Sequence, residues 1–166
     1  MPKTLPSLLL IAACLFLPAA ATAPIKRLPK VGILPTAPCE LYTAEVGAKV
    51  FTDRDAIIES IAPQIARLNA VRTPWQNAKV ELDSRAPVQL LLGIFHSDNP
   101  DFARPPSPVP TITNAATVSG MPPIDIYLSP FEKGKRILPT KGTYLILGVI
   151  PAGVAITAYD AKGGAK

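Results

Sequence analysis

The single histidine is the first residue whose type could carry chemistry. A Ser-His-Asp hydrolase of this sequence would have to use His96, yet no G-x-S-x-G nucleophile elbow accompanies it. His96, Asp98 and Asp101 lie on one segment, but a lone imidazole with two flexible carboxylates is a weak metal-ligand set, and neither H-E-x-x-H nor C-x-x-C is present. A hydrolase centred on His96 is therefore the least favoured of three functional hypotheses. We predict no catalytic residues, no metal site and no cofactor.

Paired carboxylates are the second kind of chemistry to weigh, because most glycosidases use two of them. Asp53 and Asp55 flank an arginine where the chain turns, and Glu81 and Asp83 share the polar side of an alternating segment. Both arrangements are typical of solvated structural positions. A glycine-rich phosphate loop is absent as well. No motif in the sequence identifies a catalysed reaction, so we favour a binding protein over an enzyme.

A tryptophan between a proline and two amide residues gives the most informative binding signal. Trp75 is followed directly by Gln76 and Asn77, and Arg72 precedes it by three positions. An indole ring beside amide groups can stack on a sugar ring while the amides bind its hydroxyls. We therefore predict that these four residues contact a ligand. The alternative is that Trp75 closes one end of the hydrophobic core.

Basic residues exceed acidic residues but are dispersed along the chain. The 17 Lys and Arg against 12 Asp and Glu give a formal net charge of +5. Aromatic residues are not interleaved with the basic ones, so we expect no nucleic-acid partner and favour a glycan or an envelope protein. The densest basic group surrounds an expected turn and comprises Lys133, Lys135, Arg136 and Lys141.

The first residues follow the order of a secretory signal peptide. Lys3 precedes an uncharged apolar stretch over residues 8–17, and small residues follow a proline at positions 19–23. We predict cleavage after Ala21 and a secreted or periplasmic protein. Residues 11–14 also resemble a bacterial lipobox, so a lipoprotein anchored at Cys14 is the alternative. Cys39 is then the single cysteine of the mature chain, and we expect its thiol to be buried.

The apolar run near the C-terminus is not expected to cross a membrane. Residues 142–159 carry no charged side chain over a length close to that of a membrane span. Pro151 and Gly153 interrupt the centre of this run, and β-branched residues occupy both halves. These features favour a buried β-hairpin, so no integral membrane span is predicted.

Short apolar runs separated by turn residues predict a mainly β fold. Proline makes up 20 of the 166 residues, against a usual share of about 5%, and interior proline disfavours helices. We expect an antiparallel β-sandwich or jelly-roll-like domain of about eight strands. Apolar residues at helical spacing after Asp55 predict one short helical segment near residues 56–68. The expected strands cover residues 46–52, 79–83, 88–95, 111–118, 124–128, 136–138, 143–150 and 154–159.

These patterns divide the chain into a signal peptide (1–21), an extended lead-in (22–39), a β-sandwich domain (40–160) and a flexible tail (161–166). Between residues 96 and 123 the chain is rich in proline, and polyproline-like extension is expected there. Long irregular loops are often functional or mobile. The second hypothesis is therefore a structural or protein-interaction module that uses the Pro-rich loop 100–110 or a sheet edge.

Several segments together resemble a known kind of module. They are Val50-Phe51-Thr52-Asp53-Arg54-Asp55, Ile61-Ala62-Pro63-Gln64-Ile65, Val71-Arg72-Thr73-Pro74-Trp75, the apolar run 87–95 and the run 142–148. In pattern, residues 46–150 resemble a β-sandwich accessory module of secreted bacterial proteins, often attached to glycoside hydrolases. The leading hypothesis is therefore an exported, non-catalytic module that binds carbohydrate or a cell-envelope component.

Overall fold

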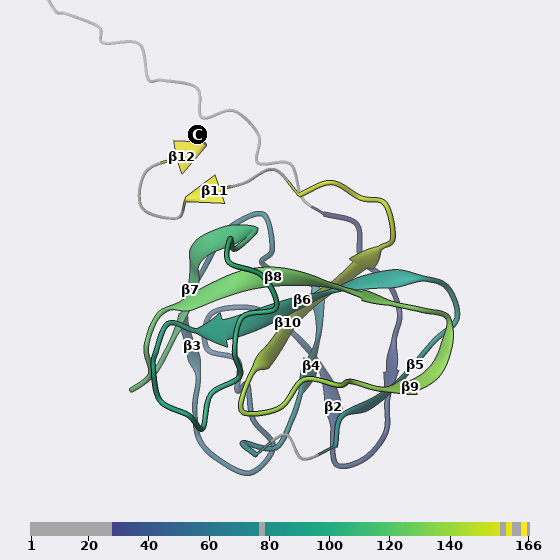
Figure 1. Cartoon of the computed structure of the whole chain (residues 1–166), viewed down its shortest axis with the longest axis horizontal. Coiled ribbons are helices and arrows are strands. Elements are labelled where there is room, and N and C mark those ends of the chain that lie inside the picture. Colours follow the sequence, from purple (N-terminus) through teal and green to yellow (C-terminus); the bar gives the residue numbers. More distant parts are fainter. Residues whose placement is uncertain (1–27, 77–78, 157–158, 161–163, 166) are drawn as a thin grey trace, which may run out of the picture.

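The computed structural model describes residues 28–76, 79–156, 159–160 and 164–165, and every regular element in these ranges is a β-strand (Figure 1). A large sheet of nine strands has the order β12-β11-β7-β8-β6-β10-β4-β2, and β3 pairs with β7 beside this path. A small sheet has the order β1-β5-β9. The strands are β1 Leu34–Pro35, β2 Glu40–Thr43, β3 Ile58–Ile61, β4 Asn69–Arg72, β5 Glu81–Ser84, β6 Val88–Phe95, β7 Ile112–Val118, β8 Ile124–Phe131, β9 Gly134–Ile137, β10 Leu145–Pro151, β11 Tyr159–Asp160 and β12 Gly164–Ala165.

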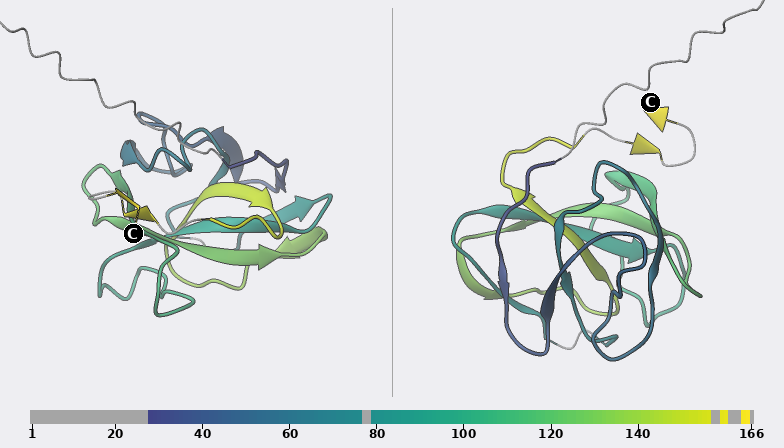
Figure 2. Two further views of the ribbon diagram at one scale, coloured as in Figure 1. Left: turned by 90° about the horizontal axis from the view of Figure 1, so that it is seen from above. Right: turned by 180° about the vertical axis from the view of Figure 1, so that it is seen from behind.

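The central strand β6 is covered on both faces, as its nearly continuous apolar sequence predicts. Leu91 and Phe95 point to a first core, which lies between the large sheet and residues 44–68. Leu90 and Leu92 point to a second core, which lies between the large sheet and the small sheet and also holds Leu82. The left view of Figure 2 shows the blue segment stacked above the green and yellow central strands. The molecule is therefore layered, with the large sheet in the middle.

The antiparallel pairing of β6 with its two neighbours forms the centre of the large sheet. It pairs with β8 along its full length, from Val88 opposite Phe131 to Phe95 opposite Ile124. On its other side it pairs with β10, with a register shift between Ile146 and Gly148. These pairings confirm an all-β, two-sheet fold whose strands are mainly antiparallel. The jelly-roll connectivity stays a prediction.

The short helix predicted near residues 56–68 is wrong. Residues 58–61 form β3, which pairs antiparallel with β7, and a turn follows. The one hydrogen bond of helical spacing in the turn runs from the Ala66 N–H to the Ala62 carbonyl at 3.1 Å. Pro63 lacks the N–H that a continuous helix needs, and Arg67 takes a positive φ of 66°. The spacing nevertheless marked buried positions, because Ile58, Ile65 and Leu68 all lie in the first core.

Strands that depend on distant partners differ most from the sequence prediction. Residues 46–52 form no strand and make only isolated bridges, from Lys49 to Ile57 and from Phe51 to Thr73. The predicted C-terminal hairpin is also wrong, because β10 pairs with β6 and β4, while Val154, Ala155 and Ile156 lie outside any strand. The twelve strands of the described ranges also differ from the expected eight, because six short ones (β1 to β4, β11 and β12) are not predicted and two predicted strands do not form.

The N-terminal part of the described chain belongs to the folded domain. Strand β1 lies inside the predicted lead-in and pairs with β5. Cys39 is buried, as expected, and burial raises the pKa of its thiol. The predicted signal peptide, with Cys14, lies outside the described residues, as does most of the predicted tail. No helix in the described ranges has the length and apolar character needed to cross a membrane.

A small residue is required where β10 passes the first core. A Cβ atom on Gly148 would lie 2.7 Å from Leu68 Cδ1 and 3.1 Å from Leu91 Cδ2. We expect Gly148→Ala to lower the free energy of unfolding by about 1–3 kcal/mol through overpacking, measured by urea denaturation. Gly32→Ala is the matched control, because nothing lies within 4 Å of its Cβ position. Equal stability of the two variants would contradict this account of the packing.

Candidate functional site

A groove opens between the loop after β6 and the segment that leads into β10. It consists of two adjoining hollows of about 440 and 520 Å³, which share Pro100, Lys141 and Gly142 among their lining residues. Volumes of this size are typical of small-molecule sites. We call it the Trp75 groove. It is lined by Trp75, Gln76, Leu92, Pro100, Asp101, Phe102, Arg104, Pro106, Leu138, Pro139, Thr140, Lys141, Gly142 and Thr143.

Backbone pairing fixes the two walls of the groove to each other. Phe102 and Thr143 form a parallel bridge, in which the Thr143 N–H donates to the Asp101 carbonyl at 2.8 Å and the Ala103 N–H donates to the Thr143 carbonyl at 3.0 Å. The Phe102 side chain is buried and packs on Phe95 at a centroid distance of 4.6 Å. This part of the Pro-rich loop is therefore anchored to the domain.

Gly142 allows the close approach of the two walls. Its φ is +83°, a conformation that favours glycine, and a Cβ atom here would lie 2.7 Å from the Ala103 backbone nitrogen. On the loop side, Asn99 shapes the turn, because its Oδ1 accepts the Asp101 N–H at 2.9 Å and its carbonyl accepts the Phe102 N–H. The shape of the groove therefore depends on the turn at Asn99 in one wall and on Gly142 in the other.

Trp75 is held firmly at one end of the groove. Its ring makes edge-to-face contacts with Phe51 and Phe102, at centroid distances of 5.1 and 5.7 Å. Its backbone N–H donates to Asp53 Oδ1 at 2.9 Å, and its carbonyl accepts the Thr143 hydroxyl at 2.6 Å. The half-buried indole both packs against the first core and lines the groove. The two sequence-based interpretations of Trp75 are therefore compatible with each other.

One face of the indole is already occupied. The Arg54 guanidinium carbon lies 3.8 Å from the centroid of the Trp75 ring, which is a cation–π distance. A ligand that stacks on Trp75 must use the uncovered part of the ring or displace Arg54. Asp53 and Arg54, which the sequence places at a structural corner, thus hold and cover the tryptophan.

The other predicted contact residues have different positions. Gln76 is exposed and lines the groove beside Trp75. Asn77 lies outside the described residues. Arg72 does not line the groove.

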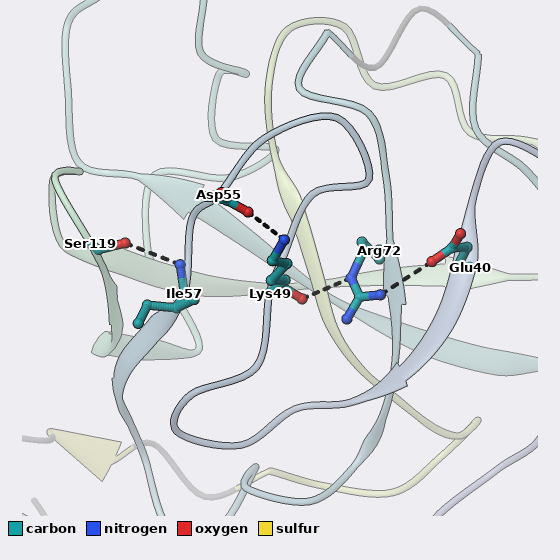
Figure 3. Close-up of polar contacts among 6 residues, drawn as sticks. All are labelled: Glu40, Lys49, Asp55, Ile57, Arg72 and Ser119. Atoms are coloured by element: carbon teal, nitrogen blue, oxygen red, sulfur yellow. Dashed lines mark hydrogen bonds and ion pairs between the residues drawn. The ribbon is translucent and has the colours of Figure 1, made fainter.

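The guanidinium of Arg72 instead ties three segments of the first core together (Figure 3). Its Nε donates to the Lys49 carbonyl at 3.0 Å, and its Nη1 pairs with Glu40 Oε2 at 3.1 Å. The guanidinium carbon also lies 5.2 Å from the Tyr42 ring centroid. Figure 3 shows the neighbouring ion pair between Lys49 and Asp55 and the hydrogen bond from the Ile57 N–H to Ser119.

Sequence reasoning did not assign the charged residues of the groove to a common site, although it considered Asp101 as a metal ligand and Lys141 as part of a basic cluster. Asp101, Arg104 and Lys141 come from two segments that are far apart in the chain, and only the Phe102–Thr143 bridge brings them together. The turn residues Pro139 and Gly142 around Lys141 were the one local signal. Neither Lys141 nor Arg104 forms an ion pair within the described ranges, so the groove carries two cations against one carboxylate.

The carboxylates weighed for catalysis do not form an acid–base pair in this groove. Glu81 lies on the small sheet, where Lys135 Nζ is 2.8 Å from Oε1 and the Thr36 hydroxyl donates at 3.0 Å. These contacts, led by the Lys135 hydrogen bond, lower the pKa of Glu81. His96 is exposed and lines a separate pocket. Within the described ranges, no three His, Cys, Asp or Glu residues are grouped to hold a metal ion.

Comparison with known proteins identifies a structural relative. No protein-family model matches the chain, and no curated protein matches it. Four chains of solved structures do match. One is described as a GH138 enzyme targeting pectin rhamnogalacturonan II, with a TM-score of 0.70 and 25% sequence identity. The match covers 84% of this chain but only 18% of that enzyme, so this β-rich fold is similar to a small part of a glycoside hydrolase.

Because Gly142 lies directly against the anchored loop, a side chain at this position should destabilise the domain. We expect Gly142→Ala to lower the free energy of unfolding by about 1–2 kcal/mol from its backbone conformation and by about 1–3 kcal/mol more from the clash with Ala103. Gly153→Ala is the control, because its φ of +79° is similar and nothing lies within 4 Å of its Cβ position. Hydrogen exchange of the Ala103 amide should rise in Gly142→Ala alone. Equal exchange in both variants would show that the loop does not depend on this contact.

Proposed function

We propose that the chain is a non-catalytic carbohydrate-binding module whose ligand occupies the Trp75 groove. The observation that carries the proposal is the groove itself, in which a fixed indole lies beside amide, hydroxyl and charged groups. The similarity to part of a carbohydrate-active enzyme supports this class of function. Attachment to, or action beside, a glycoside hydrolase is part of the same proposal.

The composition of the groove suits a sugar chain. Trp75 and Pro139 offer apolar surface to the C–H faces of sugar rings, while Gln76 and Thr140 offer hydrogen-bonding groups to hydroxyls. Lys141 and Arg104 add two positive charges against the single carboxylate of Asp101. This excess of positive charge favours a glycan that carries carboxylate groups.

Export fits a role in binding extracellular glycans. The charge-apolar-small order of residues 1–23 supports secretion to the periplasm or medium. The alternative of a lipid anchor at Cys14 would hold the same module at the cell envelope. In either case the domain would meet polysaccharides outside the cytoplasm.

A protein-interaction module is the second candidate, and the surface gives it a specific basis. Val109, on the Pro-rich loop, is 73% exposed, and Leu41, on the edge strand β2, is 48% exposed. An exposed sheet edge can pair with an extended segment of another chain. This candidate predicts a partner whose binding is lost when residues 100–110 are replaced.

Titration calorimetry with oligogalacturonides and neutral cello-oligosaccharides tests the carbohydrate proposal. We expect the acidic glycan to bind better, and Trp75→Ala to weaken its binding about tenfold or more. Gln76→Ala provides a second variant that leaves the aromatic contacts intact. Lys141→Met should weaken binding of the acidic glycan alone, whereas Lys133→Met, which changes an exposed lysine outside the groove, should change nothing. Absence of binding to both glycans, or full binding by Trp75→Ala and Gln76→Ala, would overturn the proposal.

A further inference from the structure

A second pocket lies beneath the Pro-rich loop and shares only Arg104 with the Trp75 groove. Its volume is about 450 Å³. The end of β6, strands β7 and β8, and the prolines of the loop surround it. We call it the Tyr127 pocket. The polar groups that line it belong to His96, Ser97, Asp98, Arg104, Thr113, Asp125 and Tyr127.

Tyr127 is the buried polar residue of this pocket. The residue is only 5% exposed but lines the pocket, and the described ranges give its hydroxyl no hydrogen-bond partner. The hydroxyl oxygen is not among the fully enclosed polar atoms that lack a partner, so it keeps access to the pocket and is available to a bound molecule. Burial and the negative charge of Asp125 raise the pKa of Tyr127. The phenol therefore stays protonated and can donate a hydrogen bond.

A backbone irregularity positions the neighbouring carboxylate. Asn114 has a positive φ of 47° and lies within the register shift between Ile112 and Ala116 of β7. Its N–H donates to Asp125 Oδ1 at 2.7 Å. Oδ2 has no partner in the described part of the chain and can accept from a ligand. Irregularities of this kind are frequent beside binding sites, where they redirect a side chain.

The opposite wall of the pocket combines cationic and apolar groups. Arg104 is tethered by its Nη2, which donates to the Asp98 carbonyl at 3.5 Å. Pro105, Pro108 and Pro110 provide rigid apolar surface. Two carboxylates, Asp98 and Asp125, line the pocket with one guanidinium, so with His96 counted as neutral the pocket has one excess negative charge. Because Arg104 lines both sites, the difference from the Trp75 groove comes from the other charged residues, which in the groove are Lys141 and Asp101.

We infer that the Tyr127 pocket binds a neutral, hydroxyl-rich unit of the size of one sugar residue. Asp125 accepts hydrogen bonds from ligand hydroxyls, and the Tyr127 hydroxyl donates to a ligand oxygen. The prolines contact the apolar face of the ring. The excess negative charge disfavours a carboxylated sugar, so the two sites differ in ligand class. This site does not depend on the Trp75 groove being occupied.

Two-dimensional amide NMR with D-glucose, D-galactose and L-rhamnose, each at millimolar concentration, tests this inference. We expect at least one of these sugars to shift the amide signals of Thr113, Asn114 and Asp125. Tyr127→Phe removes only the hydroxyl, and Asp125→Asn keeps an oxygen that can accept the Asn114 N–H. Each variant should weaken binding about fivefold or more.

Two controls separate this pocket from the rest of the molecule. Tyr42→Phe removes a tyrosine hydroxyl outside the pocket, and Lys133→Met changes an exposed lysine outside both sites; both should bind these sugars as the unaltered chain does. Retained amide dispersion confirms that each variant is folded. No shift of the three amides with any of the sugars, unchanged affinity in Tyr127→Phe and Asp125→Asn, or loss of binding in either control variant would overturn the inference.

Discussion

The parallel bridge between Phe102 and Thr143 is the interaction on which both candidate sites depend. It attaches the loop after β6 to the segment before β10, and it buries Phe102 between Phe95 and Trp75. One end of this loop forms a wall of the Trp75 groove, and its proline-rich end covers the Tyr127 pocket. Without the bridge the loop would have no fixed position over either site, so a few backbone hydrogen bonds determine the functional surface.

The layered core makes this attachment possible. Strands β6 and β10 are apolar on both faces, so the large sheet is covered by residues 44–68 on one side and by the small sheet on the other. Because the sheet is buried, its ends are the places where polar groups can collect. Trp75 closes the first core at such an end, and Tyr127 belongs to the second core. Each site therefore lies at the edge of a hydrophobic core, and the loop after β6 contributes part of its lining.

Part of the fold could be predicted from local sequence. Strands β6 and β8 are long and have clear apolar patterns, and both were predicted. Strands β1 to β4 have two or four residues each, so their conformation depends on distant partners rather than on a local period. The helical spacing in residues 56–68 indicated which side chains are buried but not how the backbone runs, since a strand and a turn bury the same three residues.

The residues of the candidate site likewise fall into those that the local sequence indicates and those that it does not. Trp75 and Gln76 were picked out by their neighbours in sequence, and both line the groove. Arg72 was grouped with them by proximity in the chain, but β4 directs it toward Glu40 and Lys49. The sequence gives no indication that Asp101, Arg104 and Lys141 belong to one site, because only a tertiary contact brings them together.

The affinity of the Gly142→Ala chain for an oligogalacturonide tests the central claim most directly. If the Phe102–Thr143 attachment forms the binding surface, Gly142→Ala should weaken binding about tenfold or more while Gly153→Ala binds as the unaltered chain does, both measured by calorimetry at a temperature where each is folded. Equal affinity in the two variants would contradict the claim that loop anchoring creates the site.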